Sequence, residues 1–337
     1  MARFYMKNWM EWVNSEELKK QINGRGVYAW DDTQLKELSA FLSEKGIKLE
    51  GIIGGREELI NKENYIIIAH NYRDSQIMSL LADNKLRENI DFTYIGAYTE
   101  LRCISGYYSD SRGNEIVAEG TVENVSILLE GYNNRLYIGK DTEFGDGCII
   151  KLKGSARVSF GRNIYMKNGN MFFRNSESIF QGDSYLAGNY FISNFEGYMN
   201  IGTGMQVTDG LYICVVENTR LTIGEGLLVA KDVKILSGGA HSLFDLDLKE
   251  NINIKENVHV TIGNHVWLGM DSKIIYNTDI GDNSVVGAGS IVKGVYPSHC
   301  LMAGSIAKVL RTNVDWERED YMTFPEYEEL RRKRMEK

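Results

Sequence analysis

Between residues 261 and 294 the chain reads TIGNHVWLGMDSKIIYNTDIGDNSVVGAGSIVKG, and an aliphatic residue returns at every sixth position. A strand repeats every two residues and a helix every 3.6, so neither element alone gives a period of six. A short strand followed by a turn does, and three such units complete one triangular coil. The pattern predicts a hexapeptide β-helix with columns of stacked aliphatic side chains. The repeating positions are Ile262, Leu268, Ile274, Ile280, Val286 and Val292.

The periodicity extends upstream in a looser form, as an apolar residue followed by glycine. The step from Ile201 to Ile223 fits one coil of three hexapeptides plus a bulge of four. The step from Ile235 to Ile262 is not a multiple of six, so a segment loops out there. Other upstream repeats begin at Ile138, Phe144, Ile150, Phe160 and Phe180. We therefore expect a β-helix over residues 97–312, with a loop near 236–261.

The first part of the chain, residues 1–96, follows a different pattern, in which short apolar runs alternate with helical spacing. Asp32 is a candidate N-cap and Gly46 a candidate helix stop. Such alternation predicts a small parallel α/β domain of Rossmann-like type. The first turn, AWDDTQ, lacks G-x-G-x-x-G, so we expect no dinucleotide there. The predicted strands are 26–31, 47–53, 64–70 and 92–96, and the predicted helices are 32–46 and 72–86.

Both ends of the chain are predicted to be helical. Residues 1–22 predict a lead helix with Trp9 and Trp12 packed inward. Residues 313–337 are charged and predict a short helical tail that covers the open end of the solenoid, because solenoid ends need caps.

Charge and composition exclude several classes of function. The net charge is −8, and the one dense basic run, RRKR at 331–334, is expected to be a solvated helix end. Nucleic acid is therefore an unsuitable partner. No stretch approaches the ~18 apolar residues of a membrane span, and the amino terminus lacks the features of a signal peptide. The four cysteines are scattered, which favours free thiols in the cytoplasm.

Residues 262–311 resemble the C-terminal coils of the left-handed β-helix (hexapeptide-repeat) acyltransferases. The motifs that carry the resemblance are VWLG at 266–269, DNSVVGAGS at 282–290 and AGSIAKVL at 303–310. The nearest branch holds galactoside, maltose and xenobiotic acetyltransferases and capsule-polysaccharide O-acetyltransferases. GGAHSLFDLD at 238–247 looks like that branch's active-site segment. The resemblance implies left-handed coils, a homotrimer, and acetyl-CoA bound between neighbouring prisms.

Acetyl transfer to a hydroxyl needs a base, and histidine suits that role because its pKa lies near the operating pH. His241 lies where the six-residue register breaks, and the resemblance gives the matching histidine this role. Asp245 could hold its other ring nitrogen, with Asp247 or a backbone carbonyl as alternatives. The oxyanion could be met by backbone N–H groups, for example in the turn near Gly269. Trp267 is expected at a corner, where it contacts the acceptor and the cofactor or packs in the trimer.

Coenzyme A would need room for its pantetheine arm and positive charge for its phosphates. Small residues leave that room, and lysine or arginine supplies the charge. One departure from the family is Ile306, where a proline is common. The predicted cofactor contacts are Trp267, Gly269, Gly287, Ala288, Ser290, Lys293, Lys308 and Arg311.

The sequence thus predicts an acetyl-CoA-dependent O-acetyltransferase that acts on a sugar hydroxyl of a polysaccharide, an oligosaccharide or a precursor. Two alternatives remain: an N-acetyltransferase of a nucleotide amino sugar, and a trimeric scaffold without catalysis. We expect no metal, because His259 and His265 are one hexapeptide apart and point from different faces of the prism, so they cannot share a metal within one chain. A zinc site across the trimer interface is the alternative. The identity of the acceptor is not encoded in the repeat.

Overall fold

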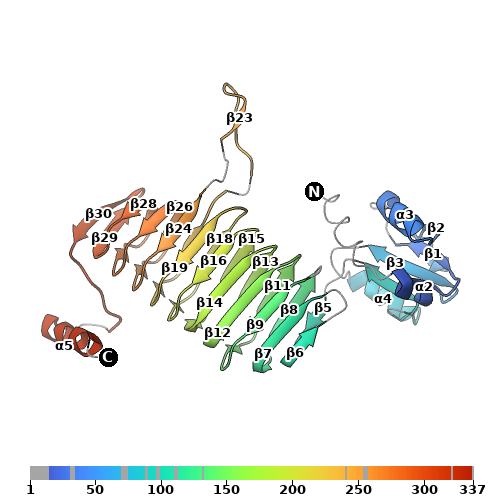
Figure 1. The fold of residues 1–337 in the computed structure, drawn as a ribbon, viewed down its shortest axis with the longest axis horizontal. Helices are drawn as coiled ribbons and strands as arrows, with labels where there is room; N and C mark the ends of the chain where they lie inside the picture. The colour runs from blue at the N-terminus through green and yellow to red at the C-terminus, as the bar shows by residue number, and fades with distance from the viewer. Residues whose placement is uncertain are drawn as a thin grey trace.

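The computed structural model describes most of the chain as a long β-solenoid with a small α/β unit at its N-terminal end and a short helix at its C-terminal end (Figure 1). This is the predicted fold class. The described residues are 15–30, 35–69, 75–87, 90–95, 99–109, 113–130, 133–239, 241–252, 257–319 and 322–335. The expectations for Trp9, Trp12 and Asp32 lie outside these residues, and the predicted boundaries between domains stay predictions.

The α/β unit is a four-stranded parallel sheet in the order β2-β1-β3-β4, with an apolar cluster on each face. Its strands fall inside the predicted runs. Gly46, the predicted helix stop, has a φ of 71°, a left-handed conformation that ends a helix at low steric cost. The elements are α2 (Ser15–Ile22), β1 (Gly26–Ala29), α3 (Leu35–Glu44), β2 (Leu49–Ile52), η1 (Glu57–Leu59), β3 (Asn64–Ala69), α4 (Ser75–Asp83) and β4 (Phe92–Ile95).

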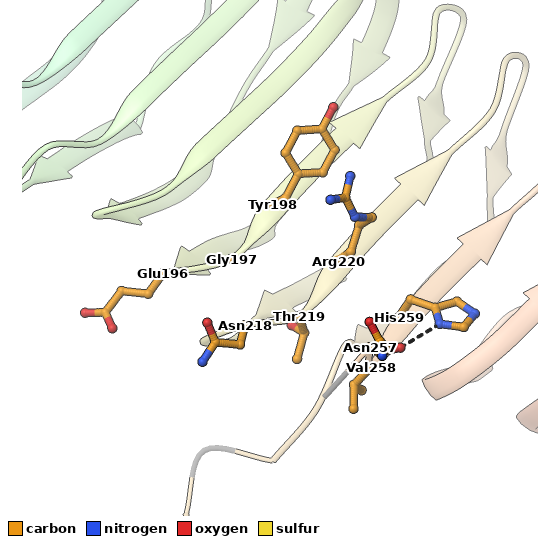
Figure 2. Close-up of a pocket in the computed structure, with 9 residues that line it drawn as sticks. All are labelled: Glu196, Gly197, Tyr198, Asn218, Thr219, Arg220, Asn257, Val258 and His259. Carbon is orange, nitrogen blue, oxygen red and sulfur yellow. Dashed lines mark hydrogen bonds between the residues drawn. The ribbon is translucent and has the colours of Figure 1, made fainter. Parts of the chain in front are cut away.

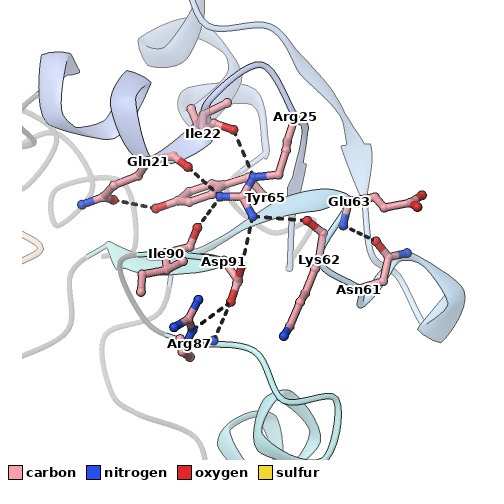
Figure 3. A network of polar contacts seen from close by, with 10 residues as sticks. All are labelled: Gln21, Ile22, Arg25, Asn61, Lys62, Glu63, Tyr65, Arg87, Ile90 and Asp91. Carbon is pink, nitrogen blue, oxygen red and sulfur yellow. Dashed lines mark hydrogen bonds and ion pairs between the residues drawn. The ribbon is translucent and has the colours of Figure 1, made fainter.

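A polar network ties the amino ends of these strands together (Figure 3). The Arg25 guanidinium donates to the buried carboxylate of Asp91 at 3.1 Å and to the carbonyl of Gln21 at 2.6 Å. It also lies over the ring of Tyr65, 5.1 Å from the ring centroid. Asp91 also accepts the backbone N–H of Arg87 at 3.0 Å, so its buried carboxylate has partners on two sides. Such a satisfied buried network favours one arrangement of the sheet.

The solenoid has three sides, and each coil contributes one strand segment to each side. The first side holds β7 (Glu115–Val122), β9 (Arg135–Ile138), the starts of β12 (Arg157–Met166) and β14 (Glu177–Leu186), β16 (Tyr198–Ile201), β19 (Arg220–Ile223), β24 (His259–Ile262) and the ends of β26 (Lys273–Ile280) and β28 (Ile291–Tyr296).

The other two sides are built in the same way. The second side holds β10 (Glu143–Phe144), the ends of β12 and β14, β17 (Gln206–Val207), β20 (Leu228–Val229), β25 (Trp267–Leu268), β27 (Val285–Val286) and β29 (Cys300–Gly304). The third side holds β8 (Val125–Glu130), β11 (Cys148–Lys153), β13 (Gly169–Arg174), β15 (Tyr190–Phe195), β18 (Leu211–Val215), β21 (Lys234–Leu236) and the starts of β26 and β28.

Antiparallel strands flank this parallel stack at both ends. At its start, β5 (Thr99–Leu101) pairs with β8, and β6 (Ile104–Ser109) pairs with β7. At its end, β30 (Ala307–Thr312) pairs with β29. The tail then continues to α5 (Phe324–Met335).

The coils are not of uniform length. One coil near the end consists of three hexapeptides, as predicted, since Val260 pairs with Thr278 and Trp267 with Val285. The step from Ile201 to Ile223 spans one coil, as predicted, and this coil is four residues longer than three hexapeptides. Earlier coils are also longer than three hexapeptides, and asparagine and aspartate adopt left-handed conformations at many of their corners. The first-side register partners that show the longer coils are Arg135, Arg157, Glu177, Tyr198 and Arg220.

Apolar columns fill the solenoid, as predicted. All six aliphatic residues of the regular repeat are at most 2% exposed. Phe160 stacks on Phe180 at 4.8 Å inside one column, and each such burial contributes about 1.5–3 kcal/mol. The column runs through Ile138, Phe160, Phe180, Ile201, Ile223, Ile262, Ile280 and Tyr296.

The glycines that follow several of these column residues have a steric role. A Cβ on Gly202 would lie 2.6 Å from the backbone of Gly224, and one on Gly161 would clash with the carbonyl of Gln181. These glycines do not have positive φ, so close approach between coils, rather than turn conformation, demands them.

Candidate functional site

The predicted loop is an arm that leaves the solenoid between β21 and β24 and stands clear of it (Figure 1). Its tip is a hairpin of β22 (Phe244–Asp245) and β23 (Glu250–Asn251). Both ends of the arm are fixed at one corner, where the hydroxyl of Ser237 contacts that of Thr219 and Arg220 donates its N–H to the carbonyl of Val258 at 3.1 Å. The arm is therefore anchored at its root, and most of its described residues are exposed.

His241 lies on this arm and is an exposed residue. Asp245 is occupied in the hairpin turn: its Oδ1 accepts the backbone N–H groups of Asp247 and Leu248, each at 2.9 Å. That role is structural, and the pairing of His241 with Asp245 or Asp247 stays a prediction.

Trp267 projects outward from the second side and is 39% exposed. It lies beside Trp316 of the tail, with ring centroids 6.0 Å apart. Trp316 is buried, stacks on His265 at 4.2 Å and donates its indole N–H to the His265 carbonyl at 2.8 Å. The tail thus returns from the last coil and covers the corner beside Trp267, a contact that sequence periodicity did not indicate.

Several predicted cofactor residues meet at the corner between the second and third sides. A Cβ on Gly269 would lie 2.5 Å from the carbonyl of Val286, and one on Gly287 would lie 2.8 Å from Ala303. Ala288 is exposed there. Gly269 donates its own N–H to Val286 at 2.9 Å, so it has none left for an oxyanion.

The remaining cofactor residues divide into buried and exposed groups. The side chain of Ser290 is buried and accepts the N–H of Gly304 at 3.2 Å, so it supports the corner from inside. Lys308 pairs across the final hairpin with Ala303 and is exposed, as is Arg311. Lys293 lies on the third side, with its ammonium 4.4 Å from the Tyr276 ring centroid. Beside Lys308, the peptide bond between Ser305 and Ile306 is cis.

Within one chain, His241 and Trp267 belong to different edges of the prism. The arm begins after a third-side strand, β21, whereas Trp267 lies on a second-side strand, β25. The small residues at 287 and 288 and the cations at 308 and 311 follow Trp267 toward the C-terminal end. The structure therefore gathers most of the predicted cofactor residues near one corner and places the predicted base elsewhere.

A pocket of about 520 Å³ opens on the first side at the root of the arm (Figure 2). Arg220 lies over the ring of Tyr198 at 4.5 Å, and its register partner is His259. His259 faces oxygen acceptors with both ring nitrogens, the Asn257 carbonyl at 3.0 Å and the Asp279 carboxylate at 3.2 Å. Both acceptors favour the protonated ring, so His259 is poorly suited to act as a base. From its sequence position, His259 was a candidate only as a metal ligand.

Among the described residues, no group of three or more His, Cys, Asp or Glu side chains could hold a metal ion. None of the described helices has the length and apolar character to cross a membrane.

Comparison with known proteins agrees with this architecture. Residues 259–294 match the family model "Bacterial transferase hexapeptide (six repeats)". A structure of the polySia-specific acetyltransferase NeuO is 22% identical, with a TM-score of 0.53, and the match covers 62% of this chain and 98% of that one. A structure of the polysialic acid O-acetyltransferase OatWY is 22% identical over 63% of this chain and 98% of that one, with a TM-score of 0.41.

A maltose O-acetyltransferase from Clostridium difficile 630 is 21% identical over 47% of this chain and 70% of that one, with a TM-score of 0.26. None of the curated proteins matches the sequence. At 22% identity the NeuO structure establishes a shared fold. Residues 259–294 of this chain carry the hexapeptide repeat of bacterial transferases within that β-helix.

Proposed function

We propose that this protein is an O-acetyltransferase that moves an acetyl group from acetyl-CoA to a sugar hydroxyl. The observation that carries the proposal is the arrangement of the site: an exposed histidine on an anchored arm, and a corner of small residues followed by Lys308 and Arg311. The proteins named above as similar in fold act on polysialic acid and maltose, which favours a carbohydrate acceptor.

In this mechanism the acceptor hydroxyl attacks the thioester carbonyl directly. His241 takes the hydroxyl proton as the new C–O bond forms, and the coenzyme A thiolate leaves when the C–S bond breaks. The imidazolium then returns its proton to the thiolate. Such a base contributes about 10²–10⁴-fold to the rate. The oxyanion donors must be N–H groups other than that of Gly269, which the coil ladder uses.

The reaction needs more than one copy of the chain. His241 and Trp267 leave the prism at different edges, so His241 of one copy can meet the cofactor corner of a neighbour in the trimer that the family resemblance implies. The arm supports this arrangement because its described residues expose five large apolar side chains, and an isolated two-stranded hairpin is marginal in water. These side chains are Leu243, Phe244, Leu246, Leu248 and Ile252.

The test is acetyl-CoA turnover against panels of oligosaccharides, polysaccharides and nucleotide sugars. We expect His241→Ala to lower turnover by at least about 100-fold, as loss of a general base does. Ser242→Ala, an exposed neighbour on the same arm, is the matched control and should retain activity. Equal turnover in His241→Ala and the parent would remove His241 from the mechanism. Activity confined to nucleotide amino sugars would favour the N-acetyltransferase alternative. The cytoplasmic location stays a prediction.

A further inference from the structure

The second side of the solenoid carries a row of outward side chains, one per coil, that runs through Trp267. The cofactor corner lies on the C-terminal side of Trp267, so the donor reaches the reaction point from that end. An acceptor must then approach from the other end. In that direction the register partners of Trp267 are Leu228, Gln206, Tyr185, Tyr165 and Glu143.

Tyr165 and Tyr185 form a stacked pair on this row, with ring centroids 5.2 Å apart and planes inclined by 13°. They line a pocket of about 310 Å³, and Tyr185 is 50% exposed. Neighbouring strands are about 4.8 Å apart, so the pair lies three and four coils, or ~14 and ~19 Å, from Trp267. That span holds several sugar rings of an extended chain.

Between Trp267 and the tyrosine pair, no corner side chains of the described residues cover the edge of the prism beside this row. The left-handed corner is occupied by Asp183, then by Gly204 and Gly226, and then by His265 under the tail. The two glycines leave two coils without corner side chains, so a ligand can lie close to the backbone there. The tail covers the corner only from His265 onward, where Trp316 packs.

The charge of this pocket indicates which class of glycan it would bind. Asp141, Glu143 and Asp183 line it, and none of its described lining residues is a lysine or arginine. Asn163 donates its amide to Asp183 at 2.9 Å, which leaves acceptor oxygens facing solvent. Carboxylates accept hydrogen bonds from hydroxyl or ammonium groups and repel anions at short range. Aromatic rings with polar tips suit a ligand that has both apolar and polar faces.

We infer that Tyr165, Tyr185 and the surrounding carboxylates form a remote acceptor subsite for a neutral or amino-bearing glycan chain whose reacting end lies at Trp267. The inference rests on the proposed function and adds the class of acceptor. It predicts that affinity rises with glycan length until the chain reaches the tyrosine pair. It also predicts discrimination against polyanionic glycans.

The experiment measures binding of the full-length protein, so that it does not depend on turnover. The probes are immobilised glucan, mannan and chitosan oligomers of increasing length, with hyaluronan and polysialate as acidic probes. We expect long neutral or amino-bearing oligomers to be retained and Tyr185→Ala to lower that retention at least tenfold. Glu143→Gln should increase retention of the acidic probes.

The matched control is Tyr212→Ala, because Tyr212 is also exposed and stacked, on Phe191 at 5.3 Å, but lies on the third side. Its retention should equal that of the parent. Thermal melting checks that each variant is folded. Preferential retention of the acidic probes, no retention of any probe, or equal retention by Tyr185→Ala and the parent would overturn the inference. Failure of the proposed function would instead show as unchanged turnover in His241→Ala.

Discussion

At the scale of the residue, His259 lies between two acceptors that favour its protonated form. The pKa of its imidazole is raised, chiefly by the hydrogen bond to the Asn257 carbonyl and then by that to the Asp279 carboxylate. A raised pKa in the folded state stabilises the protein below the unfolded value of about 6.5, and this stability is lost as the pH rises through the folded value. The pair is partly exposed, so its contribution is below about 1 kcal/mol.

Asp279→Asn removes the carboxylate that raises the pKa of His259 and leaves the hydrogen bond to the Asn257 carbonyl. We therefore expect the pKa of His259 to fall partway toward its ordinary value and the stability below pH 6.5 to decrease slightly. NMR titration of the histidine ring resonances measures the pKa, and the resonances of His299, bonded to Val314 and Asn283, serve as the control. A pKa of His259 that does not move would show that Asp279 has no part in holding the charge.

At the residue scale, His241 could be chosen as the candidate base from the sequence, because it lies where the six-residue repeat is interrupted. It could not find the contact between His265 and Trp316, which are 51 positions apart and joined only by the path of the tail. Its suggestion of oxyanion donors near Gly269 was limited for a similar reason, since which N–H groups remain free depends on the ladder between coils.

At the scale of the element, the glycines that follow several of the column residues are required by the close approach of neighbouring coils. Gly202→Ala would place a Cβ against the backbone of Gly224, which cannot rotate away as a side chain can. We expect the substitution to destabilise the solenoid by about 1–3 kcal/mol, the usual cost of overpacking. Thermal melting followed by circular dichroism gives the change.

Gly120→Ala is the control, because a Cβ there would meet nothing within 4 Å and its φ is not positive. It should melt close to the parent. If both variants melt alike, close approach is not the reason for the glycine. The strands, the columns and one hexapeptide coil near the end could be predicted from the sequence. The lengths of the other coils could not, because the left-handed asparagine and aspartate corners have no fixed spacing.

At the scale of the whole molecule, two features favour an oligomer: the apolar surface of the arm, and the separation of His241 from the predicted cofactor residues within one chain. Leu246 is 86% exposed and Leu248 67%, which is costly unless another surface covers them. We expect the parent to have a solution mass near three times its 38.3 kDa chain mass. The paired change Leu246→Asp and Leu248→Asp should lower that mass and the turnover together, measured by light scattering and by the acetyl-CoA assay.

The control for assembly is Val295→Asp, since Val295 is 80% exposed on the last coils, away from the arm. A trimer that persists in the arm variant would assign the contact to the prism sides. Periodicity along one chain reports the stacking inside that chain, so neither the assembly nor the tyrosine pair's role could be read from it.

The attachment of both ends of the arm at one corner has a consequence for how the protein can evolve. Register across it is restored without a shift, since Arg220 pairs with His259 and Ile223 with Ile262 as in any adjoining turns. An insertion that enters and leaves at one point can change its length or sequence while the scaffold below is unaffected. Exchange of the arm between related chains should therefore transfer chemistry without the need to rebuild the scaffold.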